Sequence, residues 1–160
     1  MKPLEGSITE RLSASADDCF DLISSVDRLP EWNERIHHVV EAPSGPTRVG
    51  DEWVVEMRAM ASRWNSRSRI GAVDRDGGRF ALRSQTDDGN PSYADWEWLM
   101  EPAGEGTDVT VSWRLYPKTF WRRLLLSKIR HRQLKEEVRG SLRAAERAVA
   151  GPLPARVEHE

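Results

Sequence analysis

The last third of the chain carries the side chain best suited to move a proton. Along this segment, residues spaced alternately by three and four are apolar except for Ser127 and His131, which is typical of the buried row of an amphipathic helix. A histidine in such a row can titrate near neutrality and act as a general acid or base. His131 is therefore the candidate catalytic residue; the alternative is a core histidine bonded to its neighbours, or one that touches water at a rim. The row consists of Phe120, Leu124, Ser127, His131, Leu134, Val138, Leu142, Ala145 and Val149.

The other reactive side chains form no recognisable catalytic or metal-binding set. His37 and His38 are adjacent, so on a strand we expect them to point to opposite faces and not to share a metal ion. Cys19 is the only cysteine and stands beside Asp17 and Asp18, which would raise the pKa of its thiol and make it a poor nucleophile. The chain has no G-x-S-x-G, P-loop, G-x-G-x-x-G or H-E-x-x-H motif. We therefore expect no metal and no cofactor.

These residues must be positioned by one strand, two short helices, six further strands and one long helix. Ser15 and Asp18 are spaced as a helix N-cap, and Trp32 lies in a second helical turn. Beyond it, apolar and polar residues alternate, which indicates strands joined by short hairpins. The predicted strands cover residues 7–13, 36–41, 52–59, 64–74, 79–85, 92–100 and 107–115. An antiparallel sheet of this kind has one face to cover, and the helix that extends to about residue 150 remains to cover it.

The alternation assigns the apolar residues of each strand to the face toward the helix. That face also receives Ser66, Ser68 and Ser84. Small polar residues among tryptophans suit a cavity for a mostly apolar ligand with a few oxygens. In the alternative interpretation, the serines bond to neighbouring backbone or face solvent near a rim of the sheet. Five of the seven tryptophans fall on this face, namely Trp53, Trp64, Trp96, Trp98 and Trp113.

Two segments of the chain resemble a known family. Residues 26–33 (VDRLPEWN) and 106–111 (GTDVTV), with the order of elements, are similar to the polyketide cyclase/dehydrase branch of the START-like (SRPBCC) superfamily. The resemblance covers residues 7–149 and implies an α+β helix-grip (Bet v 1-like) fold, in which a seven-stranded antiparallel sheet curls around a long C-terminal helix. It also implies a deep cavity for a hydrophobic small molecule. It implies no particular reaction, because one fold can serve many functions.

The resemblance and the residue pattern together predict binding of a lipid, polyketide or isoprenoid-type molecule in a deep, Trp-rich cavity. A cyclase/dehydratase-like enzyme that uses His131 as acid and base is the first alternative, and whether any reaction is catalysed stays open. The expected cavity lining consists of Trp32, Trp53, Val55, Met57, Trp64, Ser66, Ser68, Phe80, Leu82, Ser84, Trp96, Trp98, Trp113, Leu124, Ser127 and His131.

A basic segment near the start of the last helix supplies the second alternative. From Lys118 to Lys135 there are seven basic residues and no acidic one. A basic amphipathic segment can dock on an anionic membrane surface or on a partner protein. A helix whose arginines simply face solvent is the plainer interpretation. The residues expected to make a peripheral membrane contact are Arg122, Arg123, Lys128 and Arg130.

Length and composition exclude several other classes. The 160 residues are 38% hydrophobic with a net charge of −2, which fits one globular domain and is not a nucleic-acid-binding composition. No apolar run approaches a membrane span, and the first residues lack the apolar core of a secretory signal. We therefore expect a cytoplasmic protein with one START-like ligand-binding domain over residues 1–150. A flexible C-terminal tail is expected over residues 151–160.

Overall fold

A curled antiparallel sheet of seven strands forms most of the protein. The computed structural model describes residues 4–59, 61–89, 91–116 and 128–150. The strands are β1 (Leu4–Leu12), β2 (Ile36–Glu41), β3 (Glu52–Ala59), β4 (Ser62–Asp74), β5 (Arg79–Thr86), β6 (Tyr93–Ala103) and β7 (Gly106–Tyr116). They lie in the order β1-β7-β6-β5-β4-β3-β2, and each neighbouring pair is antiparallel. The sheet therefore has β1 and β2 as its two edge strands.

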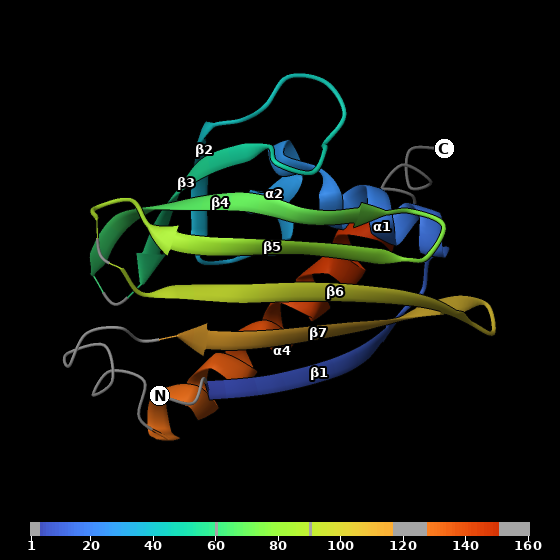
Figure 1. Ribbon diagram of the computed structural model, residues 1–160. Helices are drawn as coiled ribbons and strands as arrows, with labels where there is room; N and C mark the ends of the chain where they lie inside the picture. Colours follow the sequence, from blue (N-terminus) through green and yellow to red (C-terminus); the bar gives the residue numbers. More distant parts are fainter. Residues whose placement is uncertain (1–3, 60, 90, 117–127, 151–160) are drawn as a thin grey trace, which may run out of the picture.

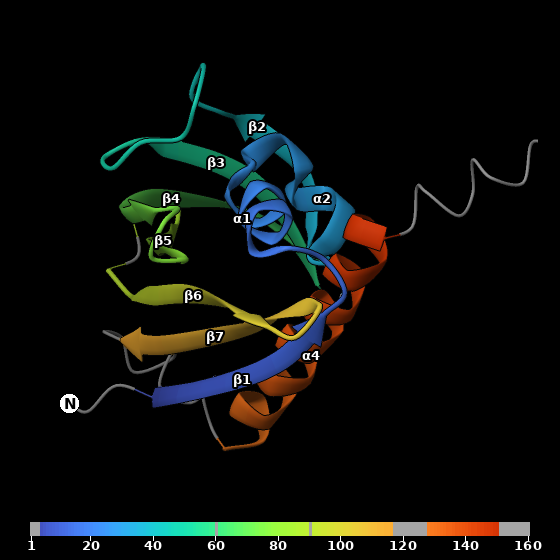
Figure 2. The ribbon, with the colours of Figure 1, turned by 90° about the vertical axis from the view of Figure 1, so that its right-hand side faces the viewer.

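Helices cover one face of this sheet. The helix α1 (Ala16–Ser24), the 3₁₀ turn η1 (Val26–Arg28) and α2 (Leu29–Trp32) connect β1 to β2, and α4 (Lys128–Ala150) crosses behind the sheet in Figure 1. Figure 2 shows α1, α2 and α4 on the same, concave side. Among the described residues, no helix is both long enough and apolar enough to cross a bilayer. The arrangement is the helix-grip fold that the family resemblance implies.

Local sequence explains where these elements begin and end. The hydroxyl oxygen of Ser15 accepts a hydrogen bond from the N–H of Asp18 at 3.1 Å, so the predicted N-cap of α1 is confirmed. Pro30 stands in the first turn of α2, where its missing N–H is not needed. The bounds of β2 and β3 agree with the prediction, and the other strands differ from it by at most three residues at either end.

The two faces of the sheet differ as the alternation predicts. Trp113 and Phe80 lie on the face that the helices cover and are each 1% exposed, whereas Arg83 and Arg114 face away and are exposed. Val54 departs from the pattern, because it is 1% exposed although it alternates with inward-facing neighbours. On α4, the predicted row is confirmed from Leu134 onward. Its earlier members Phe120, Leu124 and Ser127 lie outside the described residues.

Three register shifts among the described strands were not predicted from the alternation. One lies in the β4–β5 pair between Ile70 and Ala72, and two lie in the β2–β3 pair, between Ile36 and His38 and between Val39 and Glu41. In the bulged β2, the ring centroids of His37 and His38 lie 5.6 Å apart. The expectation that these two rings diverge is therefore wrong, because a bulge breaks the alternation of side chains.

Cys19 is fully buried in α1. Burial is the main cause that raises the pKa of its thiol, and the charges of Asp18 and Glu146 add to it. A hydrogen bond with Thr107 acts in the opposite direction. The prediction that the pKa of the Cys19 thiol is raised is confirmed. Removal of the thiol from water contributes more to this rise than the acidic neighbours on which the prediction relied.

Candidate ligand-binding cavity

An aromatic cluster occupies the middle of the inner face. The Phe80 ring lies 6.4 Å from that of Trp53 and 6.0 Å from that of Trp98, measured between centroids. The Trp96 ring lies 6.2 Å from Trp98 and 5.9 Å from Trp113. Aromatic pairs at such spacings contribute about 0.5–1.5 kcal/mol beyond their burial. Much of the inner face is therefore filled by aromatic rings that pack on one another.

A cavity of about 110 Å³ remains between this cluster and α4. Its walls come from α2 and the residues after it, from β3, β6 and β7, and from α4. The lining consists of Trp32, Asn33, Arg35, Met57, Trp96, Trp98, Val111, Leu134, Glu137, Val138, Ser141 and Leu142. Sites for organic ligands usually measure roughly 300–1,000 Å³. A ligand of that class therefore needs more room than this conformation provides.

One ion pair spans the cavity wall. Nη1 of Arg35 lies 2.6 Å from Oε2 of Glu137, and the two side chains are 22% and 29% exposed. The guanidinium of Arg35 also lies 5.7 Å from the ring centroid of Trp64. The N–H of Arg35 donates to the side-chain oxygen of Asn33 at 3.2 Å, which holds the turn after α2 in place. The ion pair thus ties the segment between α2 and β2 to α4.

Trp32, one of the residues that line the cavity, carries a buried polar atom without a partner. Its side chain is 2% exposed and lies edge-on to Trp98, with centroids 6.4 Å apart. Within the described part of the chain, its Nε1 is the one buried side-chain nitrogen or oxygen that has no hydrogen-bond partner. A buried donor left unpaired costs about 1–3 kcal/mol. An oxygen of a ligand or of water that reached Nε1 would recover part of that cost.

One of the three inward-facing serines bonds to the aromatic cluster. The Oγ of Ser84 accepts a hydrogen bond from Nε1 of Trp96 at 3.2 Å. The hydroxyl of Ser66 donates to the backbone carbonyl of Gln85 at 3.3 Å. A bond to neighbouring backbone was the alternative to a place in the cavity lining for these serines. Ser68 is 5% exposed. All three lie outside the set of residues that lines the 110 Å³ cavity.

A larger depression, of about 1160 Å³, lies on the opposite face of the sheet. Its lining includes Arg67, Arg83, Asp95, Glu97 and Arg114. Charged groups of both signs keep their hydration at such a surface, and a hydrophobic molecule would have to displace it. The smaller and mainly apolar cavity beside α4 is therefore the better site for a hydrophobic ligand.

The structure divides the predicted lining residues into three groups. Trp32, Met57, Trp96 and Trp98 line the cavity. Others are buried within the core or lie half-buried beside it, namely Trp53, Val55, Trp64, Ser66, Ser68, Phe80, Leu82, Ser84 and Trp113.

The third group lies outside the described residues. Leu124 and Ser127 belong to it. Arg122 and Arg123 of the predicted membrane contact also lie outside the described residues. The backbone of His131 lies in the first turn of α4, three residues before Leu134 of the cavity wall. The side chain of His131 is not among those described, nor are those of Lys128 and Arg130. Their predicted roles stay predictions.

Sequence reasoning missed the polar part of the cavity wall. Arg35 precedes β2 in a short turn, where no periodic pattern indicates its direction. Glu137 and Ser141 stand one residue before Val138 and Leu142 of the apolar row, and so flank it on the helix. Glu137 lies three positions after Leu134 and therefore on the same side of the helix. This spacing was the one signal in the sequence for a charged group at the cavity wall. Its partner comes from a segment about a hundred residues away in sequence and could be found only from the fold.

Comparison with known proteins agrees with this fold. The chain belongs to the family described as polyketide cyclase / dehydrase and lipid transport, whose model matches residues 5–150. No curated protein matches the chain in sequence.

Three solved structures show the same fold. Ara h 8.0201 is 15% identical with a TM-score of 0.73, over 93% of this chain and 99% of that one. A protein from Thermus thermophilus is 19% identical with a TM-score of 0.72, over 92% of this chain and 98% of that one. StfQ, a di-domain ARO/CYC from the steffimycin biosynthetic pathway, is 15% identical with a TM-score of 0.74, over 96% of this chain and 52% of that one. At these identities the similarity shows the fold alone.

Proposed function

We propose that the protein binds a hydrophobic small molecule of the lipid, polyketide or isoprenoid type between the sheet and α4. The observation that carries this proposal is the cavity itself, which lies under α4 and is walled mainly by aromatic and aliphatic side chains. Membership of a polyketide cyclase / dehydrase and lipid transport family supports the same ligand class. A cytoplasmic location is proposed with it, on the basis of the composition alone.

Ligand entry requires the cavity to widen. The ion pair between Arg35 and Glu137 joins the two walls that would separate if α4 moved away from the sheet. The pair is partly screened from water, so opening it exposes both charges again. We therefore expect a ligand either to slide past this pair or to replace one half of it with an oxygen of its own.

Two polar positions would orient such a ligand. Nε1 of Trp32 offers a donor without a partner, and Arg35 presents a guanidinium at the same wall. Both favour a ligand that is mostly apolar and carries an acceptor oxygen, such as a carbonyl or a carboxylate. An entirely apolar hydrocarbon would leave the Trp32 donor unsatisfied.

The proposal is tested with a neutral fluorescent probe, N-phenyl-1-naphthylamine, and a matched pair of variants on α4. Leu134 lines the cavity, whereas the next residue, Lys135, is exposed. We expect L134W to weaken probe binding about tenfold or more, because an indole would fill the space, and K135W to leave it unchanged. Bound probe should also quench the intrinsic tryptophan emission. Equal affinities for both variants, or unchanged emission at saturation, would count against the cavity.

Native mass spectrometry of protein purified from its own host would then identify the ligand. A mass increment that survives gentle ionisation and is lost in L134W is the expected result. The similarity to StfQ keeps the enzymatic alternative, with His131 as acid and base, in view. The described cavity wall offers one ion pair among mostly apolar groups, which favours binding over catalysis.

A further inference from the structure

The edge of the sheet farthest from β1 brings two histidines and a carboxylate together. β2 is an edge strand, and its bulge lies between Ile36 and His38. Nδ1 of His38 lies 2.9 Å from Oε1 of Glu56 on β3. One ligand atom from each of His37, His38 and Glu56 lies within 4.8 Å of the other two. The bulge is thus the feature that turns two adjacent histidines toward one carboxylate.

We propose that His37, His38 and Glu56 bind a divalent metal ion of the borderline class, with Zn²⁺ as its representative. Imidazole nitrogen and carboxylate oxygen are ligands that suit Zn²⁺, Ni²⁺ and Cu²⁺. Tetrahedral zinc with bonds of about 2.0–2.2 Å places two ligand atoms about 3.3–3.6 Å apart. Nδ1 of His38 and Oε1 of Glu56, which lie 2.9 Å apart, must therefore separate slightly to admit the ion. The His37 ring is exposed and so has room to rotate toward the other two ligand atoms, from which its nearest nitrogen lies within 4.8 Å.

The carboxylate is the anchored member of the set. The side chain of Glu56 is 14% exposed, compared with 57% for His38. Nη2 of Arg58 lies 3.8 Å from its Oε1, and Nη1 of Arg63 lies 3.7 Å from its Oε2. These guanidinium groups hold the carboxylate in place and also repel a cation. We therefore expect a weak site, in the micromolar range or above, whose affinity rises when one arginine is removed.

The set is distinct from the ligand cavity. Glu56 and Met57 are consecutive on β3, and Met57 lines the cavity beside α4 whereas Glu56 pairs with His38. Three protein ligands leave the remaining coordination positions of the ion open to water. The two proposals can therefore fail independently, because L134W should not affect metal binding and loss of the metal should not abolish probe binding.

The test is isothermal titration of the full-length protein with zinc chloride at neutral pH, with five variants. We expect one ion per chain, and we expect H37A, H38A and E56Q each to weaken binding about tenfold or more. H159Q removes a histidine elsewhere in the chain and should leave the affinity unchanged. R63Q should strengthen binding several-fold, because it removes a repelling charge and leaves all three ligands.

Proton NMR of the imidazole rings makes the assignment direct. The resonances of His37 and His38 should shift or broaden on addition of Zn²⁺, while those of His131 and His159 should not. Circular dichroism establishes that each variant is folded. The proposal is overturned if no binding occurs at millimolar zinc, if H159Q abolishes it, or if H37A binds as the unaltered protein does. That last result would leave a plain ion pair between His38 and Glu56.

Discussion

The two faces of the sheet use the same strands and rely on different interactions. On the inner face, Trp96 of β6 stands opposite Trp113 of β7. One residue earlier on β6, Asp95 stands opposite Arg114 and forms two hydrogen bonds with Arg83 of β5. In the inner pair Trp113 is buried and Trp96 is half-buried, whereas the outer groups keep much of their hydration. Burial on the inner face therefore supplies most of the stability of the sheet, and the outer face mainly supplies solubility.

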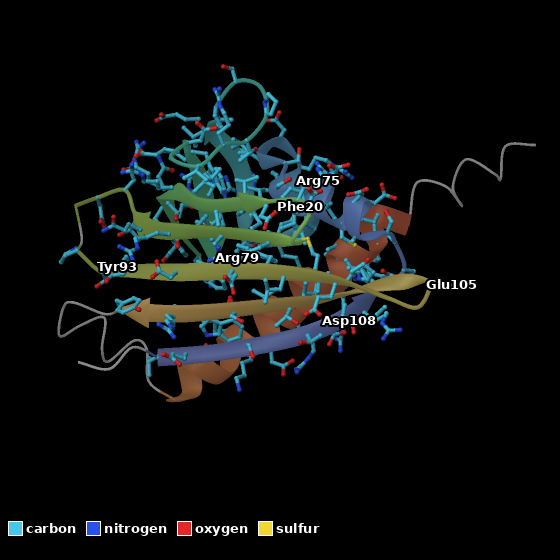
Figure 3. The ribbon with its side chains drawn as sticks, turned by 45° about the vertical axis from the view of Figure 1, so that its right-hand side comes forward. Phe20, Arg75, Arg79, Tyr93, Glu105 and Asp108 are labelled. Carbon is cyan, nitrogen blue, oxygen red and sulfur yellow. The ribbon has the colours of Figure 1, made fainter. Side chains whose placement is uncertain are left out.

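The outer face carries ion pairs between neighbouring strands, each formed by an arginine and a carboxylate. Arg79 of β5 pairs with Glu97 of β6, and Arg114 of β7 pairs with Glu5 of β1 at 3.2 Å. The guanidinium of Arg83 also lies 4.1 Å from the ring centroid of Tyr93. Figure 3 labels Arg79 and Tyr93 on these strands. Covering this face with another surface would remove these charged groups from water, which is costly.

The largest expected effect comes from the largest fully buried side chain, which lies on the inner face. Trp113 is 1% exposed and packs against Trp96. W113A should lower the free energy of unfolding by about 3–5 kcal/mol, since it removes a large apolar surface and leaves a cavity. Urea denaturation followed by circular dichroism measures this. W113F should lose less than half as much, and equal losses for both variants would contradict the packing argument.

A smaller loss is expected where a glycine makes room for the same indole. A Cβ built on Gly6 would lie 2.5 Å from Cζ2 of Trp113, whereas a Cβ on Gly140 of α4 would meet nothing within 4 Å. G6A should therefore destabilise the protein by about 1–3 kcal/mol through overpacking. G140A should be neutral or stabilising by about 0.5–1 kcal/mol, because alanine favours the helix. Thermal unfolding of the two single variants compares them, and the same sign for both would refute the close approach.

The smallest effect is expected on the outer face. Arg83 and Asp95 form a bidentate pair with 53% and 35% exposed side chains. A double-mutant cycle with R83A and D95A should give a coupling energy of about 0–1 kcal/mol. Added salt should reduce it further. A coupling as large as the W113A loss would show that the two faces do not differ in the way described.

Alternation along the strands was sufficient to predict which face is buried. The inward positions of Trp53, Phe80, Trp98 and Trp113 followed from a period of two, and one-sided burial makes that register strict. The family resemblance added that the sheet curls around the C-terminal helix. Together they predicted the fold, including the helix that covers the sheet.

Bulges and long-range partners could not be predicted in this way. The register shift in β2 adds a residue to one strand of a pair, and nothing in the residue types of His37 and His38 indicates it. The partnership of Arg35 with Glu137 depends on where α4 crosses the turn after α2. The size of the cavity depends on how several rings pack together. These features arise from tertiary packing, which a local pattern does not contain.

The chain of rings through the core also has an optical consequence. Centroid separations near 6 Å connect Trp98 to Trp96, and Trp96 to Trp113. Excitation absorbed by one indole in such a chain is transferred to its neighbours before it is emitted. The polarisation of the tryptophan fluorescence should therefore be low. A ligand that quenches Trp96 or Trp98 would therefore also quench the emission of the tryptophans that transfer energy to them, so that one bound ligand lowers the fluorescence of several residues.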